Sequence, residues 1–148
     1  MLVNNPAVAP LTVLRALNDQ VVNNSEVLVD APALVLPVGA SEVWIVDIVL
    51  FVSSPSTTPD IDWLFTVPGG ASLVVLDHYG SDMSWPAIVA TAELPLANVK
   101  PATQFMRTRA VYIGGATPGN VQFRWAQTVA TVEDTVLRAN SMLVCIKA

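Results

Sequence analysis

Apolar and polar residues alternate from Asn120 to Trp125 within the segment 119–127. Its apolar set is Val121, Phe123 and Trp125, and its polar set is Asn120, Gln122 and Arg124. Successive side chains of a β-strand point to opposite faces of the sheet. The pattern therefore predicts an antiparallel strand with one buried face and one solvated face.

The segment 42–53 differs because both of its faces are apolar. One face carries Trp44, Val46, Ile48, Leu50 and Val52, and the other carries Val43, Ile45, Asp47, Val49 and Phe51. An antiparallel strand of this kind must be covered twice, once by the core and once by something else. We expect a neighbouring subunit or an exchanged arm to give the second cover. The subunit boundary then lies either at Trp44, Ile48 and Leu50 or at the opposite face with Ile45, Val49 and Phe51.

Asp47 places a carboxylate among these apolar side chains. A charge in such a strand needs a partner. Arg107 and Arg109 share one face of the predicted strand 103–114 and are the natural candidates. We therefore predict a structural ion pair, within the chain or across a subunit boundary, in preference to a catalytic acid.

From about Glu26 onward the chain consists of short segments rich in Val, Ile, Thr, Phe and Trp, separated by turn residues. The predicted strands are 26–30, 33–37, 42–53, 60–67, 72–77, 87–94, 103–114, 119–128 and 135–147, the last divided near Asn140. Short strands at this spacing, without a long helical pattern between them, predict an all-β fold. We expect an antiparallel jelly-roll-like sandwich or barrel.

The first 25 residues differ in composition from the rest of the chain, with Pro6, Pro10 and several asparagines. Leu11, Leu14 and Leu17 recur every three residues after Pro10, which suits a first helical position. We expect an N-terminal arm (1–25) with a short helical turn, followed by a β-domain (26–148). The arm leucines should dock on the chain's own barrel or on a neighbour, and crossing to a neighbouring subunit is the arrangement that we favour.

Composition points to self-association. The 148 residues are 53% hydrophobic and only 13% charged. A domain of this size buries about two-thirds of its chain surface, so the remaining apolar side chains need further cover. The apolar runs are too short for a membrane span, which takes about 20 residues. The net charge is −5 and the seven basic residues are scattered, so we expect no nucleic-acid partner.

Candidate chemistry is sparse, and we expect no enzyme, no metal and no cofactor. The chain has one histidine, His78, and one cysteine, Cys145, which lies in an apolar run. Neither brings the further ligands of a zinc or calcium site. Asp60 and Asp62 fit turn capping, and the chain contains no Gly-x-Ser-x-Gly nucleophile motif.

Four segments together resemble a β-rich module of tailed-bacteriophage structural proteins. They are 58–63 (Thr-Pro-Asp-Ile-Asp-Trp), 65–71 (Phe-Thr-Val-Pro-Gly-Gly-Ala), 122–127 (Gln-Phe-Arg-Trp-Ala-Gln) and 135–143 (Thr-Val-Leu-Arg-Ala-Asn-Ser-Met-Leu). The resemblance covers about residues 26–148. Within this group, the length, the arm and the apolar composition are most similar to a trimeric capsid decoration (cement) protein of a thermophile-infecting phage.

The resemblance implies a thermostable homotrimer on the outer capsid surface of a virion, clamping subunits of the major capsid protein. Eleven prolines against seven glycines agree with thermostability, because proline restricts the unfolded chain. The same module occurs in tail and fibre proteins. The alternative function is therefore a tail-fibre or receptor-binding module that recognises carbohydrate through exposed aromatics such as Tyr79 and Trp85.

Overall fold

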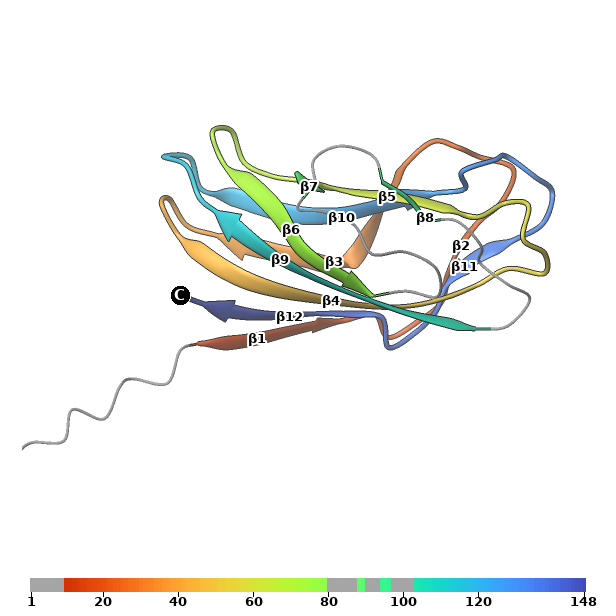
Figure 1. The fold of residues 1–148 in the computed structure, drawn as a ribbon, viewed down its shortest axis with the longest axis horizontal. Helices are drawn as coiled ribbons and strands as arrows, with labels where there is room; N and C mark the ends of the chain where they lie inside the picture. Colours follow the sequence, from red (N-terminus) through yellow and green to blue (C-terminus); the bar gives the residue numbers. More distant parts are fainter. Residues whose placement is uncertain (1–9, 80–87, 90–93, 97–102) are drawn as a thin grey trace, which may run out of the picture.

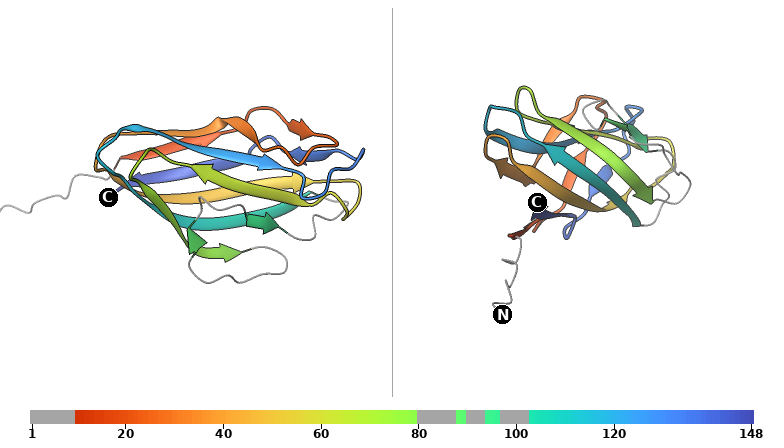
Figure 2. Two further views of the ribbon diagram at one scale, coloured as in Figure 1. Left: turned by 90° about the horizontal axis from the view of Figure 1, so that it is seen from above. Right: turned by 60° about the vertical axis from the view of Figure 1, so that its left-hand side comes forward.

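The computed structural model describes residues 10–79, 88–89, 94–96 and 103–148. These residues form two antiparallel β-sheets that pack face to face (Figure 1), which confirms the all-β sandwich expected from the sequence. Two further views show the two layers and the connections between them (Figure 2). Among the described residues, no helix is long and apolar enough to cross a membrane.

The larger sheet has eight strands. Its main path runs in the order β1 (Leu11–Arg15), β12 (Met142–Lys147), β4 (Val43–Ser53), β9 (Gln104–Ile113), β6 (Ser72–Tyr79) and β7 (Ile88–Val89). Two short strands extend it beside β4, namely β11 (Thr135–Leu137) and β2 (Gln20–Val22). Strand β4 lies in the middle of this sheet, so its backbone is paired on both sides.

The smaller sheet has four strands in the order β3 (Val29–Val38), β10 (Gly119–Ala126), β5 (Ile61–Thr66) and β8 (Leu94–Leu96). Three aromatic rings meet where this sheet faces the larger one. The ring centroids of Trp63 and Phe123 lie 5.9 Å apart, and those of Phe65 and Phe123 lie 5.3 Å apart. All three side chains are buried, so aromatic side chains fill this part of the space between the sheets.

Strand β10 has the two faces that the alternation predicted. Val121, Phe123 and Trp125 are fully buried, whereas Asn120, Gln122 and Arg124 face outward. The last predicted strand also divides where expected: β11 and β12 are separated by a turn in which Asn140 has a φ of 72°. Asparagine tolerates this left-handed conformation better than most residues.

Two predicted strands, 26–30 and 33–37, are a single strand in the structure. The register of β3 against β10 jumps from Val35↔Gln122 to Asp30↔Arg124, so β3 bulges around Pro32. Proline lacks the N–H that a regular ladder needs, and a bulge accommodates it. The Gln122 side-chain amide donates to the carbonyl oxygen of Ala31 at 2.8 Å and so satisfies part of the interrupted ladder.

The helical turn predicted after Pro10 is wrong, because Leu11–Arg15 forms strand β1. Strand β1 pairs with β12, and β2 pairs with β11 of the same chain. The three-residue spacing of the leucines suggested a helix, but Thr12 and Val13 between them are β-branched and suit a strand. Of the two docking places expected for this segment, the chain's own β-domain is the one occupied here. Residues 1–9 of the predicted arm lie outside the described residues.

Candidate interaction surface

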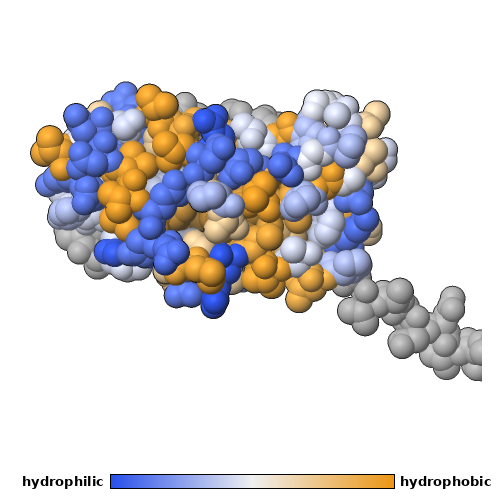
Figure 3. All heavy atoms as spheres, turned by 180° about the vertical axis from the view of Figure 1, so that it is seen from behind, coloured by the Kyte–Doolittle hydropathy of each residue, from blue (hydrophilic) through white to orange (hydrophobic). Residues whose placement is uncertain are grey.

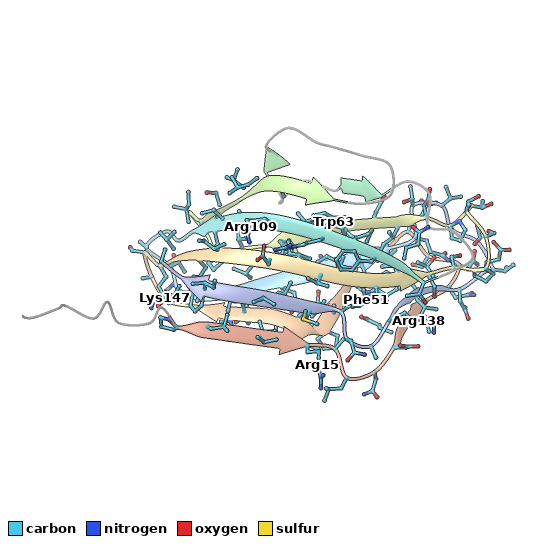
Figure 4. The ribbon with its side chains drawn as sticks, turned by 60° about the horizontal axis from the view of Figure 1, so that its bottom comes forward. Arg15, Phe51, Trp63, Arg109, Arg138 and Lys147 are labelled. Atoms are coloured by element: carbon cyan, nitrogen blue, oxygen red, sulfur yellow. The ribbon has the colours of Figure 1, made fainter. Side chains whose placement is uncertain are left out.

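The side of the larger sheet that faces away from the core is called the outer face below. Figure 4 looks onto this sheet, with β1, β12, β4 and β9 side by side. Alternate residues of the four strands form the outer face: Leu11, Val13, Arg15, Val43, Ile45, Asp47, Val49, Phe51, Phe105, Arg107, Arg109, Val111, Ile113, Met142, Val144 and Ile146. All but four of these side chains are apolar.

Apolar residues on the outer face are aligned across the strands. Leu11 pairs with Ile146, Ile146 with Ile45, and Ile45 with Val111. Leu11 is 61% exposed at one end of this row, whereas Ile45 is half-buried between its neighbours. Contiguous apolar surface of this kind is typical of an interaction site.

An aromatic pair continues the outer face towards one end of β4. The rings of Phe51 and Phe105 lie 5.8 Å apart, and Phe105 is 47% exposed. Within the described residues, no second layer of structure lies over these rings or over the apolar row. The outer face is thus the second apolar face that the sequence of β4 predicted.

The structure brings together Asp47, Arg107 and Arg109 on the outer face. The Nε and Nη2 atoms of Arg109 donate to the two carboxylate oxygens of Asp47 at 2.7 and 2.8 Å, and Arg107 donates at 3.4 Å. The hydrogen bond from Arg109 is the main cause that holds the pKa of Asp47 below its ordinary value. The carboxylate is therefore ionised and paired in a strand that is otherwise apolar.

Half of each arginine side chain is exposed, whereas the Asp47 side chain is only 16% exposed. An ion pair with this much solvent contact adds little to stability by itself. Its effect is to neutralise the one acid of β4, so that the surrounding apolar side chains can be covered by a partner without leaving an unpaired carboxylate.

The expectation that Trp44, Ile48 and Leu50 lie at a subunit boundary is wrong. All three side chains point between the sheets and are 7%, 1% and 2% exposed. Strand β4 is apolar on both faces, so its sequence does not distinguish the core side from the other side. The structure assigns the outer role to the opposite set, with Ile45, Val49 and Phe51.

The three arm leucines do not share a face. Leu11 lies on the outer face, whereas Leu14 points inward and packs against the core. Leu17 follows β1 and is 70% exposed beside a groove of about 490 Å³. Of the three, Leu11 is therefore the one that contributes to the outer face.

A polar clasp that the sequence did not reveal joins the β3–β4 turn to the C-terminal strand. Glu42 accepts hydrogen bonds from the Lys147 ammonium group and, at 2.9 Å, from the indole N–H of Trp44. The Lys147 ammonium also lies 5.9 Å from the centroid of the Trp44 ring. The hydrogen bond from Lys147 is the main cause that lowers the pKa of Glu42 to about 2. The two charged residues are 105 positions apart, so no local pattern points to their contact.

A buried glutamine organises the loops at one end of the sandwich. The Gln127 side chain is fully buried, donates to the carbonyl oxygen of Glu133 at 2.6 Å, and accepts from the N–H of Ser25 at 3.1 Å. It thereby ties the loop before β3 to the loop before β11. Gln127 ends the 122–127 segment on which the family resemblance partly rests, and its role here is structural.

The described residues offer little for catalysis. They contain no group of three metal-ligating side chains. In the groove beside Leu17, Asp19 accepts hydrogen bonds from Arg138 and from the N–H of Ala139. Burial raises the pKa of the Cys145 thiol to about 12, so it is not a nucleophile at neutral pH. The side chains of His78 and Tyr79, and Trp85 as a whole, lie outside the described part of the structure.

The opposite side of the molecule has a different surface. Viewed from behind relative to Figure 1, polar and apolar patches alternate (Figure 3). The outward residues of β10, namely Asn120, Gln122 and Arg124, are polar. Gln122 lies across from Thr66 of β5, and Arg124 lies across from Leu64. Arg124 also pairs with Asp30 at 2.8 Å. The apolar row Leu11–Ile146–Ile45–Val111 lies on the larger sheet.

Comparison with protein-family models, curated proteins and solved structures found no match.

Proposed function

We propose that this chain is a non-enzymatic structural protein of a virion. In this proposal it decorates and stabilises the outer surface of a tailed-phage capsid, as a homotrimer that also contacts the major capsid protein. The observation that carries the proposal is the outer face, where one apolar row, Leu11–Ile146–Ile45–Val111, spans four strands. The virion, the capsid surface and the number three come from the resemblance of segments 58–63, 65–71, 122–127 and 135–143 to phage structural proteins.

The mechanism is adhesion. Covering apolar surface contributes about 25 cal/mol for each Å² removed from water, and a stable protein interface buries about 800 Å² on each partner. A sheet face four strands wide can supply an interface of that kind. The ion pairs of Asp47 with Arg107 and Arg109 are already formed in the single chain, which reduces the cost of covering these charges.

The segments that carry the resemblance serve the core and the loops. Trp63, Phe65, Phe123 and Trp125 are buried between the sheets, and Gln127 ties two loops together. They therefore support the β-rich fold that the resemblance implies. The outer face is a separate observation, and it supports self-association.

The carbohydrate-binding alternative depends on Tyr79 and Trp85, whose side chains lie outside the described residues. No described residue favours it over the adhesive role. Binding to a glycan array that disappears in Trp85→Ala would favour this alternative.

Placement in a virion can be tested by immunogold electron microscopy on particles induced from a strain that carries the gene, with antibodies against the purified protein. The proposal predicts label distributed over the capsid shell. Label confined to tails or fibres would contradict the capsid role, and particles without label would contradict the virion role. Ile45→Lys should remove the shell label, whereas Val35→Lys, on the outward side of the smaller sheet, should keep it.

A further inference from the structure

The free edge of strand β1 is the feature from which we draw a further inference. Strand β1 ends the path of the larger sheet, and within the described residues no strand pairs with its other edge. An open strand edge presents unpaired backbone N–H and C=O groups and is a template for another strand.

The hydrogen bonds around β1 show which of its residues face this edge. The N–H of Lys147 donates to the carbonyl oxygen of Pro10 at 3.2 Å, and the N–H of Ala16 donates to that of Ser141 at 2.8 Å. Backbone direction alternates along an antiparallel strand, so Thr12 and Leu14 also pair with β12. The N–H and C=O groups of Leu11, Val13 and Arg15 therefore point to the open edge.

Strand β1 has little of the usual protection against edge pairing, because its one charged residue, Arg15, stands at its end. Its sequence, Leu-Thr-Val-Leu-Arg, contains no proline and no lysine, and its register with β12 is unbroken by a bulge. Natural edge strands are commonly protected by one of these devices. Leu11 and Val13 are in addition 61% and 53% exposed.

We infer that this edge pairs with the β1 edge of a second copy of the chain, antiparallel, with Val13 opposite Val13 of the other copy. In this register Leu11 of each copy lies opposite Arg15 of the other, so all three residues on the open edge gain backbone partners. The two Arg15 residues are then separated by four residue positions along the paired strands, which is about 13 Å at a rise of about 3.3 Å per residue. A parallel pairing would place them side by side, where like charges repel.

The side chains also favour this partner. In a two-stranded antiparallel pair, residues directly opposite each other point to the same side of the sheet. Leu11 and Val13 of both copies then lie on one side, and the outer faces of the two copies become continuous. Leu14 of each copy stays on the core side, where it packs in the single chain.

This inference goes beyond the proposed function, because it concerns the edge of the sheet and a two-fold contact. The proposed trimer uses the outer face, so the two contacts can coexist, and β1 pairing would then link trimers to one another. Their failures are distinguishable. A trimer that never forms larger species contradicts the β1 pairing alone, whereas a protein that stays monomeric at every concentration contradicts both.

The edge can be probed with Val13→Pro. Proline removes the N–H that points to the open edge and leaves the N–H groups that pair with β12. Light scattering across a dilution series should show that this variant loses the two-fold species, whereas the control Val13→Thr, which keeps the N–H and a β-branched shape, should retain it. Equal behaviour of the two folded variants would overturn the inference.

Two substitutions at Leu11 test the register without a proline. Leu11→Glu places a carboxylate opposite Arg15 of the other copy, and Leu11→Lys places a like charge there. Each contact contains two such pairs, so Leu11→Glu should tighten the two-fold association about two- to thirtyfold, with Leu11→Lys weakening it by a similar factor. Equal dissociation constants for the two variants would contradict this register.

Thiol crosslinking gives a direct readout. The single natural cysteine, Cys145, is buried, so an introduced exposed thiol reacts by itself. In the inferred register, Val13→Cys puts two thiols opposite each other. Leu17→Cys puts the two thiols eight residue positions apart along the strands, which is about 27 Å at about 3.4 Å per residue. A short bis-maleimide should join Val13→Cys into covalent dimers and leave Leu17→Cys monomeric on a denaturing gel. Similar crosslinking of both would overturn the inference.

Discussion

The outward sides of β10 and β4, which lie inside the two sheets rather than at their edges, differ in chemistry, although their inner sides are both apolar. On the smaller sheet, β10 turns Asn120, Gln122 and Arg124 to the outside. On the larger sheet, β4 turns Ile45, Val49 and Phe51 outward, with Asp47 as the acid among them. The polar outward side of β10 can remain in contact with water, whereas contact with water is unfavourable for the apolar outward side of β4. The apolar row that a partner could cover therefore lies on the larger sheet.

The polar groups on the two sides also differ in their surroundings. Asp30 on the smaller sheet is 62% exposed and pairs with Arg124. Asp47 on the larger sheet is 16% exposed and is held by two arginines. A carboxylate with little water around it depends more on its partners. The larger sheet therefore carries a paired carboxylate within its apolar face.

The largest predicted effect separates the two sides of β4. Ile48→Ala removes side-chain atoms from the fully buried side and should lower the free energy of unfolding by about 2–5 kcal/mol. Val49→Ala, on the half-buried outer face, should lower it by about 1 kcal/mol or less. Urea denaturation of both variants at a concentration where the protein is monomeric measures the difference. Equal losses would show that the outer side is packed as tightly as the core.

A smaller effect separates the acids of the two sheets. Asp47→Asn removes the carboxylate that Arg107 and Arg109 share, and should lower the free energy of unfolding by up to about 1 kcal/mol. Asp30→Asn disturbs a more exposed pair and should cost less than about 0.5 kcal/mol. Thermal denaturation at low salt compares them. A larger loss for Asp30→Asn would reverse the proposed difference between the sheets.

The smallest effect concerns acid stability at the end of the larger sheet. The pKa of Glu42 is about 2 in the folded protein and about 4.5 when unperturbed. The unfolded state therefore binds a proton first, and the stability that Glu42 contributes is present above about pH 4.5 and is lost as the pH falls towards 2. Glu42→Gln should make the melting temperature less dependent on pH in this window, while Glu26→Gln serves as the control. Identical pH profiles for wild type and Glu42→Gln would contradict the role of the clasp with Lys147.

The sequence allowed part of this structure to be predicted. Alternation gave the two faces of β10, and the need of Asp47 for a partner pointed to Arg107 and Arg109, which the structure places within hydrogen-bond distance. These inferences worked because they used a period of two and a single uncompensated charge. The alternation is a signal local in the chain, and the uncompensated charge is a chemically specific one.

Other features depend on long-range contacts. Strand β1 forms because β12 offers it a ladder, whereas its own leucine spacing suggested a helix. The core side of β4 is fixed by the sheet that packs on it, and both of its faces are apolar in sequence. The bulge of β3 at Pro32 is satisfied by Gln122, 91 positions away from Ala31. None of these partners is adjacent in the chain, so local patterns were insufficient.

The central claim is that the outer face of the larger sheet is where copies of this chain associate. Multi-angle light scattering across a dilution series tests it most directly, on wild type, Ile45→Lys and Val35→Lys. The last two place the same charge at half-buried outward positions of the larger and smaller sheets. We predict that wild type and Val35→Lys form the same stable oligomer, and that Ile45→Lys loses the association through the outer face and retains at most the two-fold species paired through β1. A wild-type monomer throughout, or an Ile45→Lys variant that associates as wild type does, would contradict the account.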